Sequence, residues 1–492
     1  MSLRRDITWG IFWVGVSRIG TSALQFLTTL VLMRLVERAD FGLIGMAYLA
    51  IETLELFREL GFTSALIYRK RDIEKAADTA FYVVIGMGAA LCATTFIASP
   101  YIALFFKTPH LEEVLRVLAF TTVLRSFGEV PLTLLSKEMS FDKRVVPDIV
   151  PTLGYGLTAT AFALVGLGVW SLVIGRIVES VLDATLVWFF VSWRPKWRFD
   201  RAIGREMFDY GKHILGSQVL IFFITNIDDA FVGRILGTDP LGSYQLAYKL
   251  SNQPATNISR LLGQVMFPAF SRIQDNVDSM RRAFFKSVRY VSLVAIPLTA
   301  GIVTFGPAFL RTVYAGKWND AIIPLQLLAI YGLLRAIAVN MGSVLKAGGK
   351  PDWIMYIAVL RLSVMGILLY PATKYYGIVG VSALSAIVSI VDFVISAVLT
   401  NRVIRGTMWE YVRILTPPVV YATISSAVAW VVYDLTSVQH GFISLVLAGA
   451  LMVLLDVTLT WVFDRELRRT TREVIEEMQE RGRQLIESLQ QL

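Results

Sequence analysis

The chain has 492 residues, of which 55% are hydrophobic and only 17% are charged, with a net charge of +9. Soluble proteins carry about 25% charged residues, so this composition excludes an ordinary soluble domain and indicates a polytopic membrane protein. The single cysteine, Cys92, excludes an intramolecular disulfide. The three histidines lie far apart in the sequence, and we therefore expect no metal site.

The predicted elements are apolar segments, each close to the roughly 20 residues that cross a bilayer as a helix. In chain order they cover 8–36, 40–67, 77–105, 111–136, 145–167, 169–192, 208–237, 240–270, 287–307, 321–346, 352–373, 376–401, 410–434 and 440–463. They predict an all-α fold of about fourteen transmembrane helices. The charged segment 464–492 carries apolar residues every three or four positions, which predicts an amphipathic helix on the membrane, on a partner or in solvent.

Basic residues are distributed unevenly between the two sides that these spans define. Of the 47 lysines and arginines, 31 fall in segments on the side of the N-terminus and 8 on the opposite side. The positive-inside rule therefore predicts that both termini are cytoplasmic. A net positive charge can also indicate a nucleic-acid partner. Because this charge is concentrated in short loops on one side, we expect no nucleic acid.

The sequence repeats itself weakly at an offset of 200 residues. The matching pairs are Ser17 and Ser217, Arg34 and Arg234, Gly42 and Gly242, and Tyr48 and Tyr248. Chance similarity between glycine-rich turns is the alternative. A repeat of six spans predicts two parallel lobes with a central site between them, as in many transporters. We therefore predict an N-terminal lobe at 1–207, a C-terminal lobe at 208–405, two extra spans at 406–463 and the tail helix at 464–492.

Eight basic residues fall inside predicted spans, where each would cost about 2.5–3.5 kcal/mol facing lipid. They must therefore face a protein interior or a hydrated cavity. Polar residues share one face of the first span and one face of the eighth. On the first span these are Arg18 and Gln25, and on the eighth they are Lys249, Asn252, Gln253 and Arg260. We interpret these faces as walls of a cavity that binds an anionic substrate.

Two further arginines, Arg58 and Arg335, are also candidates for substrate binding. The guanidinium group suits this role because it stays charged and grips phosphate oxygens with two parallel hydrogen bonds. The alternative is that the intramembrane charges only pair with one another. We expect that alternative for Arg125, Arg176 and Arg361, unless they lie near the ends of their spans.

Three carboxylates inside spans, Asp228, Asp229 and Asp392, are candidates for binding a coupling ion, H⁺ or Na⁺. Salt bridges to the intramembrane arginines are the alternative. The sequence contains no G-x-x-x-x-G-K-[ST] motif. Without a nucleotide site we expect no cofactor, and the energy must come from an ion gradient, the membrane potential or the substrate gradient.

Several segments resemble a known family. They are Glu59–Ile67 with Arg69–Asp72, Tyr244–Asn252, Gln264–Arg272, Tyr314–Trp318 and Gly348–Pro351. Together they resemble the polysaccharide transporter family (O-antigen and exopolysaccharide flippases, Wzx-type) of the multidrug/oligosaccharidyl-lipid/polysaccharide (MOP) exporter superfamily. The resemblance covers essentially the whole chain, and Gln264–Arg272 is its most specific part.

The resemblance implies a V-shaped cavity between two six-helix lobes, followed by two extra helices. It also implies a flippase for polyprenyl-pyrophosphate-linked oligosaccharides in O-antigen, exopolysaccharide or capsule synthesis, working by alternating access. We accordingly expect a monomer in the inner membrane that contacts membrane lipid and the polysaccharide polymerase machinery, and that is not an enzyme. The alternatives are a membrane polymerase or glycosyltransferase, which would need a larger outer loop, and a drug or small-cation exporter, whose cavity would favour acidic and apolar residues.

Overall fold

The structure, a computed structural model, describes residues 3–58, 60–138, 140–464 and 468–469. Its description of side chains leaves out residues 3–12, 14, 16, 213, 214, 217, 220, 253–265, 267, 268 and 437–440. Throughout the described ranges the ordered elements are helices, and none of them is a strand, which confirms the all-α prediction there. The predicted tail helix at 464–492 lies almost entirely outside these ranges.

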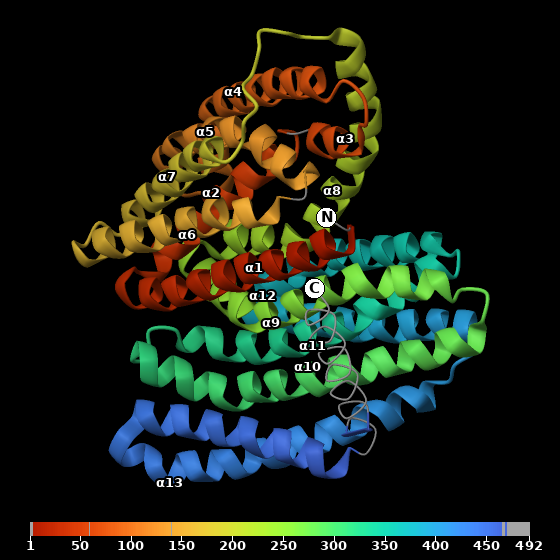
Figure 1. The fold of residues 1–492 in the computed structure, drawn as a ribbon. Helices are drawn as coiled ribbons and strands as arrows, with labels where there is room; N and C mark the ends of the chain where they lie inside the picture. The colour runs from red at the N-terminus through yellow and green to blue at the C-terminus, as the bar shows by residue number, and fades with distance from the viewer. Residues whose placement is uncertain (1–2, 59, 139, 465–467, 470–492) are drawn as a thin grey trace, which may run out of the picture. The chain divides into compact units, whose positions relative to one another are not determined.

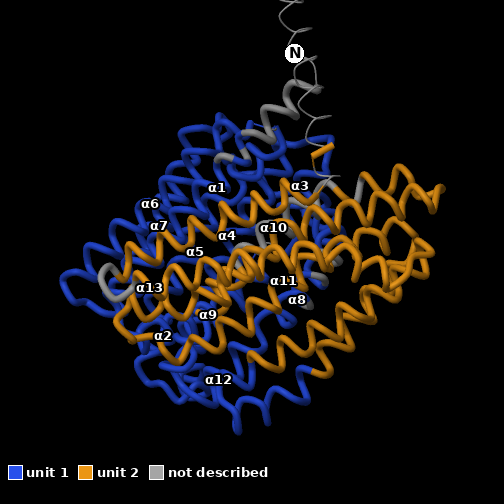
Figure 2. The backbone as a smooth tube through the Cα atoms, turned by 90° about the horizontal axis from the view of Figure 1, so that it is seen from below, with its two compact units in different colours: residues 1–246, 365–381 blue, residues 247–364, 382–492 orange. Residues whose placement is uncertain are grey.

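The chain divides into two units, residues 1–246 with 365–381 and residues 247–364 with 382–492 (Figure 2). Helices of unit 1 are α1 (Leu3–Leu35), α2 (Arg38–Glu55), α3 (Phe62–Tyr68), α4 (Ile73–Phe106), α5 (Leu111–Lys137), α6 (Phe141–Leu164), α7 (Val169–Leu186), η1 (Val187–Phe189) and α8 (Arg201–Leu236). Helices of unit 2 are α10 (Val277–Tyr314), η2 (Asn319–Ala321), α11 (Ile322–Ala347) and α13 (Met408–Phe463). Two helices, α9 (Thr238–Arg272) and α12 (Pro351–Ile404), contribute to both units.

Most predicted segments coincide with one helix each. Within unit 1, α4 packs along α5 and α6 packs along α7 (Figure 1). Seven stretches within the described residues are long and apolar enough to cross a bilayer, namely Ile73–Phe106, Leu111–Lys137, Val277–Tyr314, Asn319–Ala347, Pro351–Ile404, Met408–Thr436 and Gly441–Phe463. The chain is therefore a multi-pass membrane protein.

The predicted segment 40–67 is divided into two helices, α2 and α3. The backbone between them is left-handed at Leu60 and Gly61, with φ values of 45° and 74°. A side chain on Gly61 would overlap Gly211 of α8, so the two backbones are in direct contact there. The glycine is required both by its positive φ and by this close approach.

Two other predicted pairs of spans appear as single long helices. The 54 residues of α12 contain one non-helical residue, Gly377, with a φ of 60° and a ψ of −149°. This kink falls at the second residue of the predicted segment 376–401, just after the segment 352–373 ends, so each half of α12 corresponds closely to one of them. Similarly, α13 covers both 410–434 and 440–463.

The starts of α2 and α9, which the sequence predicts to be related by a repeat, contact each other reciprocally. A Cβ on Gly42 would overlap the carbonyl of Thr238, and a Cβ on Gly242 would overlap the carbonyl of Arg38. Residues 38 and 238, like 42 and 242, are 200 positions apart. Residue 42 therefore meets 238 in the same way as residue 242 meets 38. Exchanging the two repeats turns one contact into the other, which is what a local two-fold axis produces. Small residues let helix backbones approach this closely in membranes.

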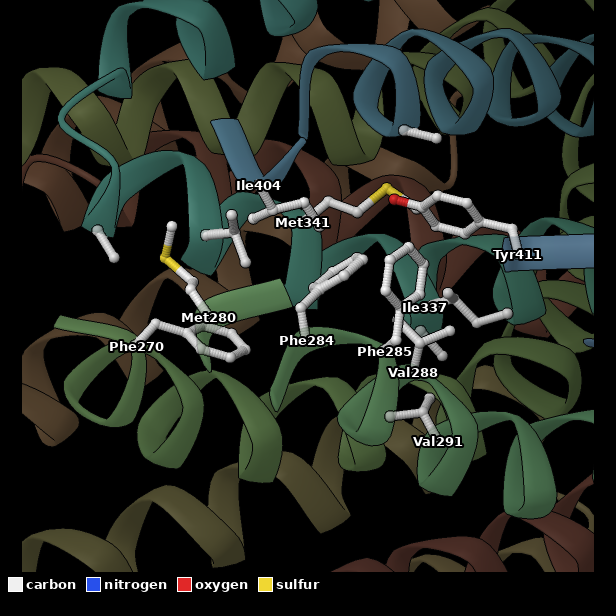
Figure 3. Packing of buried hydrophobic residues seen from close by; sticks show 14 of the residues in the cluster. Phe270, Met280, Phe284, Phe285, Val288, Val291, Ile337, Met341, Ile404 and Tyr411 are labelled. Atoms are coloured by element: carbon white, nitrogen blue, oxygen red, sulfur yellow. The ribbon is translucent and has the colours of Figure 1, made fainter. Parts of the chain in front are cut away.

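The core of unit 2 is built on aromatic contacts between α10 and the start of α13 (Figure 3). The ring of Phe285 lies 5.1 Å from those of both Phe284 and Tyr411. At the same end, Glu410 forms a capping box with Thr407 and an ion pair of 2.9 Å with Arg281 of α10. The cap and the ring contacts together fix the point at which α13 begins.

Candidate functional site

Three of the intramembrane arginines of unit 1, namely Arg58, Arg125 and Arg176, are paired with carboxylates. Arg58 lies 3.1 Å from Glu129 of α5, and Arg125 lies 3.4 Å from Glu55 of α2. The second pair joins α2 to α5, and the first joins the turn after α2 to α5. Because each guanidinium has an acidic partner, these arginines neutralise charge within the unit, which is one of the two roles that the sequence leaves open.

A third arginine of unit 1, Arg176 of α7, combines an acidic partner with an aromatic one. Its guanidinium lies 2.7 Å from Glu179 and 5.4 Å from the centre of the Tyr48 ring. A guanidinium over an aromatic face is attracted by the partial negative charge on the face of the ring. Arg176 and Arg125 thus have the ion pairs that the sequence predicts for them.

The adjacent carboxylates Asp228 and Asp229 of α8 both bond to side chains at the start of α9. Asp228 is 7% exposed and accepts a hydrogen bond of 2.5 Å from the hydroxyl of Tyr244. Asp229 accepts one of 3.3 Å from the amide of Gln245. Both partners are uncharged. They therefore hold the two carboxylates in place but do not neutralise their negative charge.

Unit 2 contains a cluster of arginine and tyrosine side chains from three helices, which we call the arginine–tyrosine cluster. Its members are Tyr248 of α9, Tyr331 and Arg335 of α11, and Arg361 of α12. The Tyr248 and Tyr331 rings lie 6.3 Å apart. Arg335 donates to the Tyr248 hydroxyl at 3.5 Å, and Arg361 donates to the Tyr331 hydroxyl at 2.8 Å. The Arg361 guanidinium also lies 5.5 Å from the centre of the Tyr331 ring.

The positive charge of this cluster is only partly compensated. Asp392 of α12 lies 3.9 Å from Arg361, which is a long ion pair of the kind that the sequence predicts for this arginine. Among the described residues no carboxylate lies within 4.0 Å of Arg335. The two guanidinium groups bond to Tyr248 and Tyr331, whose rings are neighbours. One carboxylate against two guanidinium groups leaves an excess positive charge between helices, which is an arrangement that attracts an anion.

The other predicted site residues lie on helices of both units. Arg18 and Gln25 are exposed on α1, and Lys249 is exposed on α9 next to Tyr248. Asn252 is buried, and its amide lies 3.4 Å from the hydroxyl of Ser251.

The side chains of Gln253 and Arg260, by contrast, lie outside the described part of the structure. The substrate-binding assignment of all the predicted residues stays a prediction.

Tyr331 is not among the site residues that the sequence predicts. It lies four residues before Arg335, the spacing that places two side chains on one face of a helix. That spacing, applied to each intramembrane arginine, is a signal that could have found it. No group of three or more histidine, cysteine, aspartate or glutamate side chains suited to a metal ion occurs in the ranges that the structure describes.

Comparison with known proteins identifies relatives along most of the chain. TuaB, a teichuronic acid biosynthesis protein of Bacillus subtilis, is 27% identical over 85% of this chain and 87% of its own length. WzxC, a lipopolysaccharide biosynthesis protein of Escherichia coli, is 25% identical over 83% of this chain and 84% of its own.

A solved structure of the lipid II flippase MurJ, in an inward closed conformation, has a similar fold, with a TM-score of 0.71. The match covers 91% of this chain and 99% of that structure at 14% identity. The profile of the family described as "Polysaccharide biosynthesis protein" matches residues 31–323. Because this match covers more than half of the 492 residues, the chain belongs to the polysaccharide biosynthesis protein family.

Proposed function

We propose that this protein is a flippase that moves polyprenyl-pyrophosphate-linked oligosaccharide units across the cytoplasmic membrane by alternating access. The single observation that carries the proposal is the excess positive charge of the arginine–tyrosine cluster. A pyrophosphate has at least two negative charges and cannot enter hydrocarbon uncompensated. The family membership and the fold shared with a lipid II flippase support the same reading.

The chemistry of the cluster suits a sugar pyrophosphate. Arg335 and Arg361 offer planar sets of N–H donors that match phosphate oxygens. The tyrosine hydroxyls orient the guanidinium groups without neutralising them, and the rings of Tyr248 and Tyr331 provide flat surfaces for sugars. Arg18 and Lys249, both exposed, and Arg260 are further contacts in this proposal. The lipid tail stays in the bilayer while the headgroup crosses.

The topology that we propose has fourteen spans, with both termini in the cytoplasm. Seven stretches already have the length and composition of spans, and one of these, α12, becomes two at Gly377. The remaining six are α1, α2, α6, α7, α8 and α9, whose 18 to 36 residues suffice in length. Their charged side chains lower their hydropathy, and these include the arginines and carboxylates described above.

Transport in this proposal is coupled to H⁺ or Na⁺, or driven by the substrate gradient, with Asp228, Asp229 and Asp392 as the candidate ion ligands. The protein itself makes or breaks no covalent bond. It acts as a monomer and delivers its cargo to the polysaccharide polymerase machinery.

The test is to delete the gene in its host and locate the lipid-linked oligosaccharide with a probe that reaches only the outer leaflet. Complete units should accumulate in the inner leaflet, and the wild-type gene should release them. An Arg335→Gln/Arg361→Gln variant at normal protein level should not. The control variant Lys143→Gln/Arg272→Gln loses the same charge from two exposed positions and should restore export.

Two outcomes would contradict the proposal. Units that reach the outer face normally after deletion would show that the protein does not move them. Units that stall as incomplete sugars would instead indicate a polymerase or a glycosyltransferase.

A further inference from the structure

A pocket of about 440 Å³ opens in unit 1, between the end of α3 and the first turns of α8. Its lining consists of Ala65, Tyr68, Arg69, Lys70, Arg71, Glu206, Met207 and Tyr210. The arginine–tyrosine cluster belongs to unit 2, so this pocket is a different site, and the proposed transport step makes no use of it. A volume of this size suits a small headgroup.

The walls of the pocket are held together by three contacts between α3 and α8. Gly61 and Gly211 meet at backbone distance, with no room for a side chain on either. The rings of Tyr68 and Tyr210 are stacked, with their centres 5.0 Å apart and their planes at 12°. Arg69 lies 2.8 Å from Glu206. These contacts form the pocket before any ligand binds.

The end of a helix normally presents unpaired carbonyl groups, whose partial negative charge would repel an anion. Here the ammonium group of Lys137 occupies that end of α3. It donates to the carbonyl oxygens of Leu66 and Ile67, each at 2.9 Å, and to that of Arg69. The partial negative charge at the end of α3, next to the pocket, is therefore neutralised by the ammonium group of Lys137.

The remaining charges around the pocket are mainly positive. Arg69 donates to Glu206 and to the carbonyl of Arg71, which occupies two of its five N–H groups. The side chains of Lys70 and Arg71 are exposed and have neither ion pair nor hydrogen bond within the described residues. Three cations against one carboxylate give the pocket a net positive charge of two.

The position of the pocket places it at the membrane surface. Residue 73 begins α4, one of the stretches long and apolar enough to cross a bilayer. Tyr68 is 69% exposed and Tyr210 is 42% exposed. Tyrosine is enriched where membrane and water meet, and basic clusters next to a span attract anionic lipids.

We infer that this pocket binds the phosphate headgroup of an anionic membrane phospholipid. Lys70 and Arg71 contact the phosphate, and the stacked pair of Tyr68 and Tyr210 lies against the glycerol backbone. The carboxylate of Glu206 limits the affinity because its negative charge lies beside the phosphate. The site fixes the junction of α3 and α8 to the cytoplasmic leaflet.

The test measures ligand binding to the purified full-length chain in a neutral detergent. The probes are dioctanoyl phosphatidylglycerol, dioctanoyl phosphatidylcholine and inorganic pyrophosphate. We expect the phosphatidylglycerol to bind, the phosphatidylcholine not to bind, and the pyrophosphate not to compete. Lys70→Gln/Arg71→Gln should weaken binding about twenty-five-fold, since each basic residue at an anionic surface contributes about a factor of five.

Two further variants separate a binding role from a structural one. Glu206→Gln should tighten binding of the phosphatidylglycerol, because it removes the negative charge beside the phosphate while the amide oxygen still accepts a hydrogen bond from Arg69 and keeps the wall in place. Lys143→Gln/Arg272→Gln removes two exposed cations elsewhere and should leave binding unchanged. Equal weakening by both double variants, or weaker binding by Glu206→Gln, would overturn the inference. Pyrophosphate that competes fully would identify a site for soluble phosphates instead.

Discussion

Unit 1 and unit 2 hold their intramembrane arginines in different ways. In unit 1, Arg58, Arg125 and Arg176 each lie within 3.4 Å of a carboxylate oxygen. In unit 2, Arg335 and Arg361 donate to tyrosine hydroxyls, and Arg361 has one carboxylate at 3.9 Å. An ion pair neutralises the positive charge of an arginine. A hydrogen bond to a tyrosine hydroxyl orients the guanidinium group but leaves its positive charge to attract an anionic ligand.

The type of partner, carboxylate or hydroxyl, distinguishes arginines that stabilise the fold from arginines that are candidates for ligand binding. The buried fraction of the side chain does so less well. Arg58 is the more buried residue, with 7% exposure, yet its charge is compensated. Arg335 is only partly buried, yet no carboxylate among the described residues lies within ion-pair distance of it. The comparison therefore predicts stability defects for substitutions in unit 1 and transport defects for those in unit 2.

The largest expected effect is on the stability of unit 1. Arg58→Met should lower the free energy of unfolding by about 3 kcal/mol, because it leaves Glu129 inside the protein without its partner. Adding Glu129→Leu should recover most of the loss, since replacing a whole buried pair by apolar residues is nearly neutral. Unfolding in detergent, followed by circular dichroism, measures both. An unchanged stability of Arg58→Met would show that the pair is not structural.

The second effect concerns substrate binding in unit 2 and rests on the proposed function. Arg335→Gln should weaken binding of a short-chain polyprenyl pyrophosphate by about tenfold to a hundredfold, the range for a hydrogen bond to a charged group. Its stability should stay close to that of the wild type. Arg125→Gln is the matched control, for which we expect reduced stability and unchanged affinity. The reverse pattern would remove the distinction between the two units.

The smallest effect compares the repeat-related tyrosines. Tyr48 meets Arg176 through its ring, whereas Tyr248 meets Arg335 through its hydroxyl. Tyr248→Phe should therefore weaken binding of the same ligand about fivefold, the value of one hydrogen bond, and Tyr48→Phe should leave it unchanged. Titration of the two variants side by side decides this. Equal losses would mean that both tyrosines act through their hydroxyl groups.

Much of the fold could be predicted from the sequence, because the length of an apolar run reports directly on a membrane helix. The segments 77–105 and 111–136 fall within α4 and α5, for example. The break between α2 and α3 could not be predicted. It depends on the contact of Gly61 with Gly211, and hydropathy does not record which backbones touch.

Less of the candidate site could be predicted. Helical periodicity places Arg335 on a helix but does not say which side chains of other helices surround it. The ion pairs of Arg125 and Arg176 were expected, and they follow from acidic residues nearby on the same or adjacent helices. The contact of Arg361 with Tyr331 joins α12 to α11, and it emerges only from tertiary packing.

The reciprocal contact of Gly42 and Gly242 has a meaning for the ancestry of the chain. A duplication of a half-length gene yields two copies of each surface, and a two-fold contact uses the same surface twice. The contact around residues 38, 42, 238 and 242 is of this kind. In the duplication that the 200-residue offset predicts, a half-length ancestor with one such glycine pairs with a second copy of itself through this surface. The junction between the repeats would then preserve a dimer interface older than the fusion of the two halves.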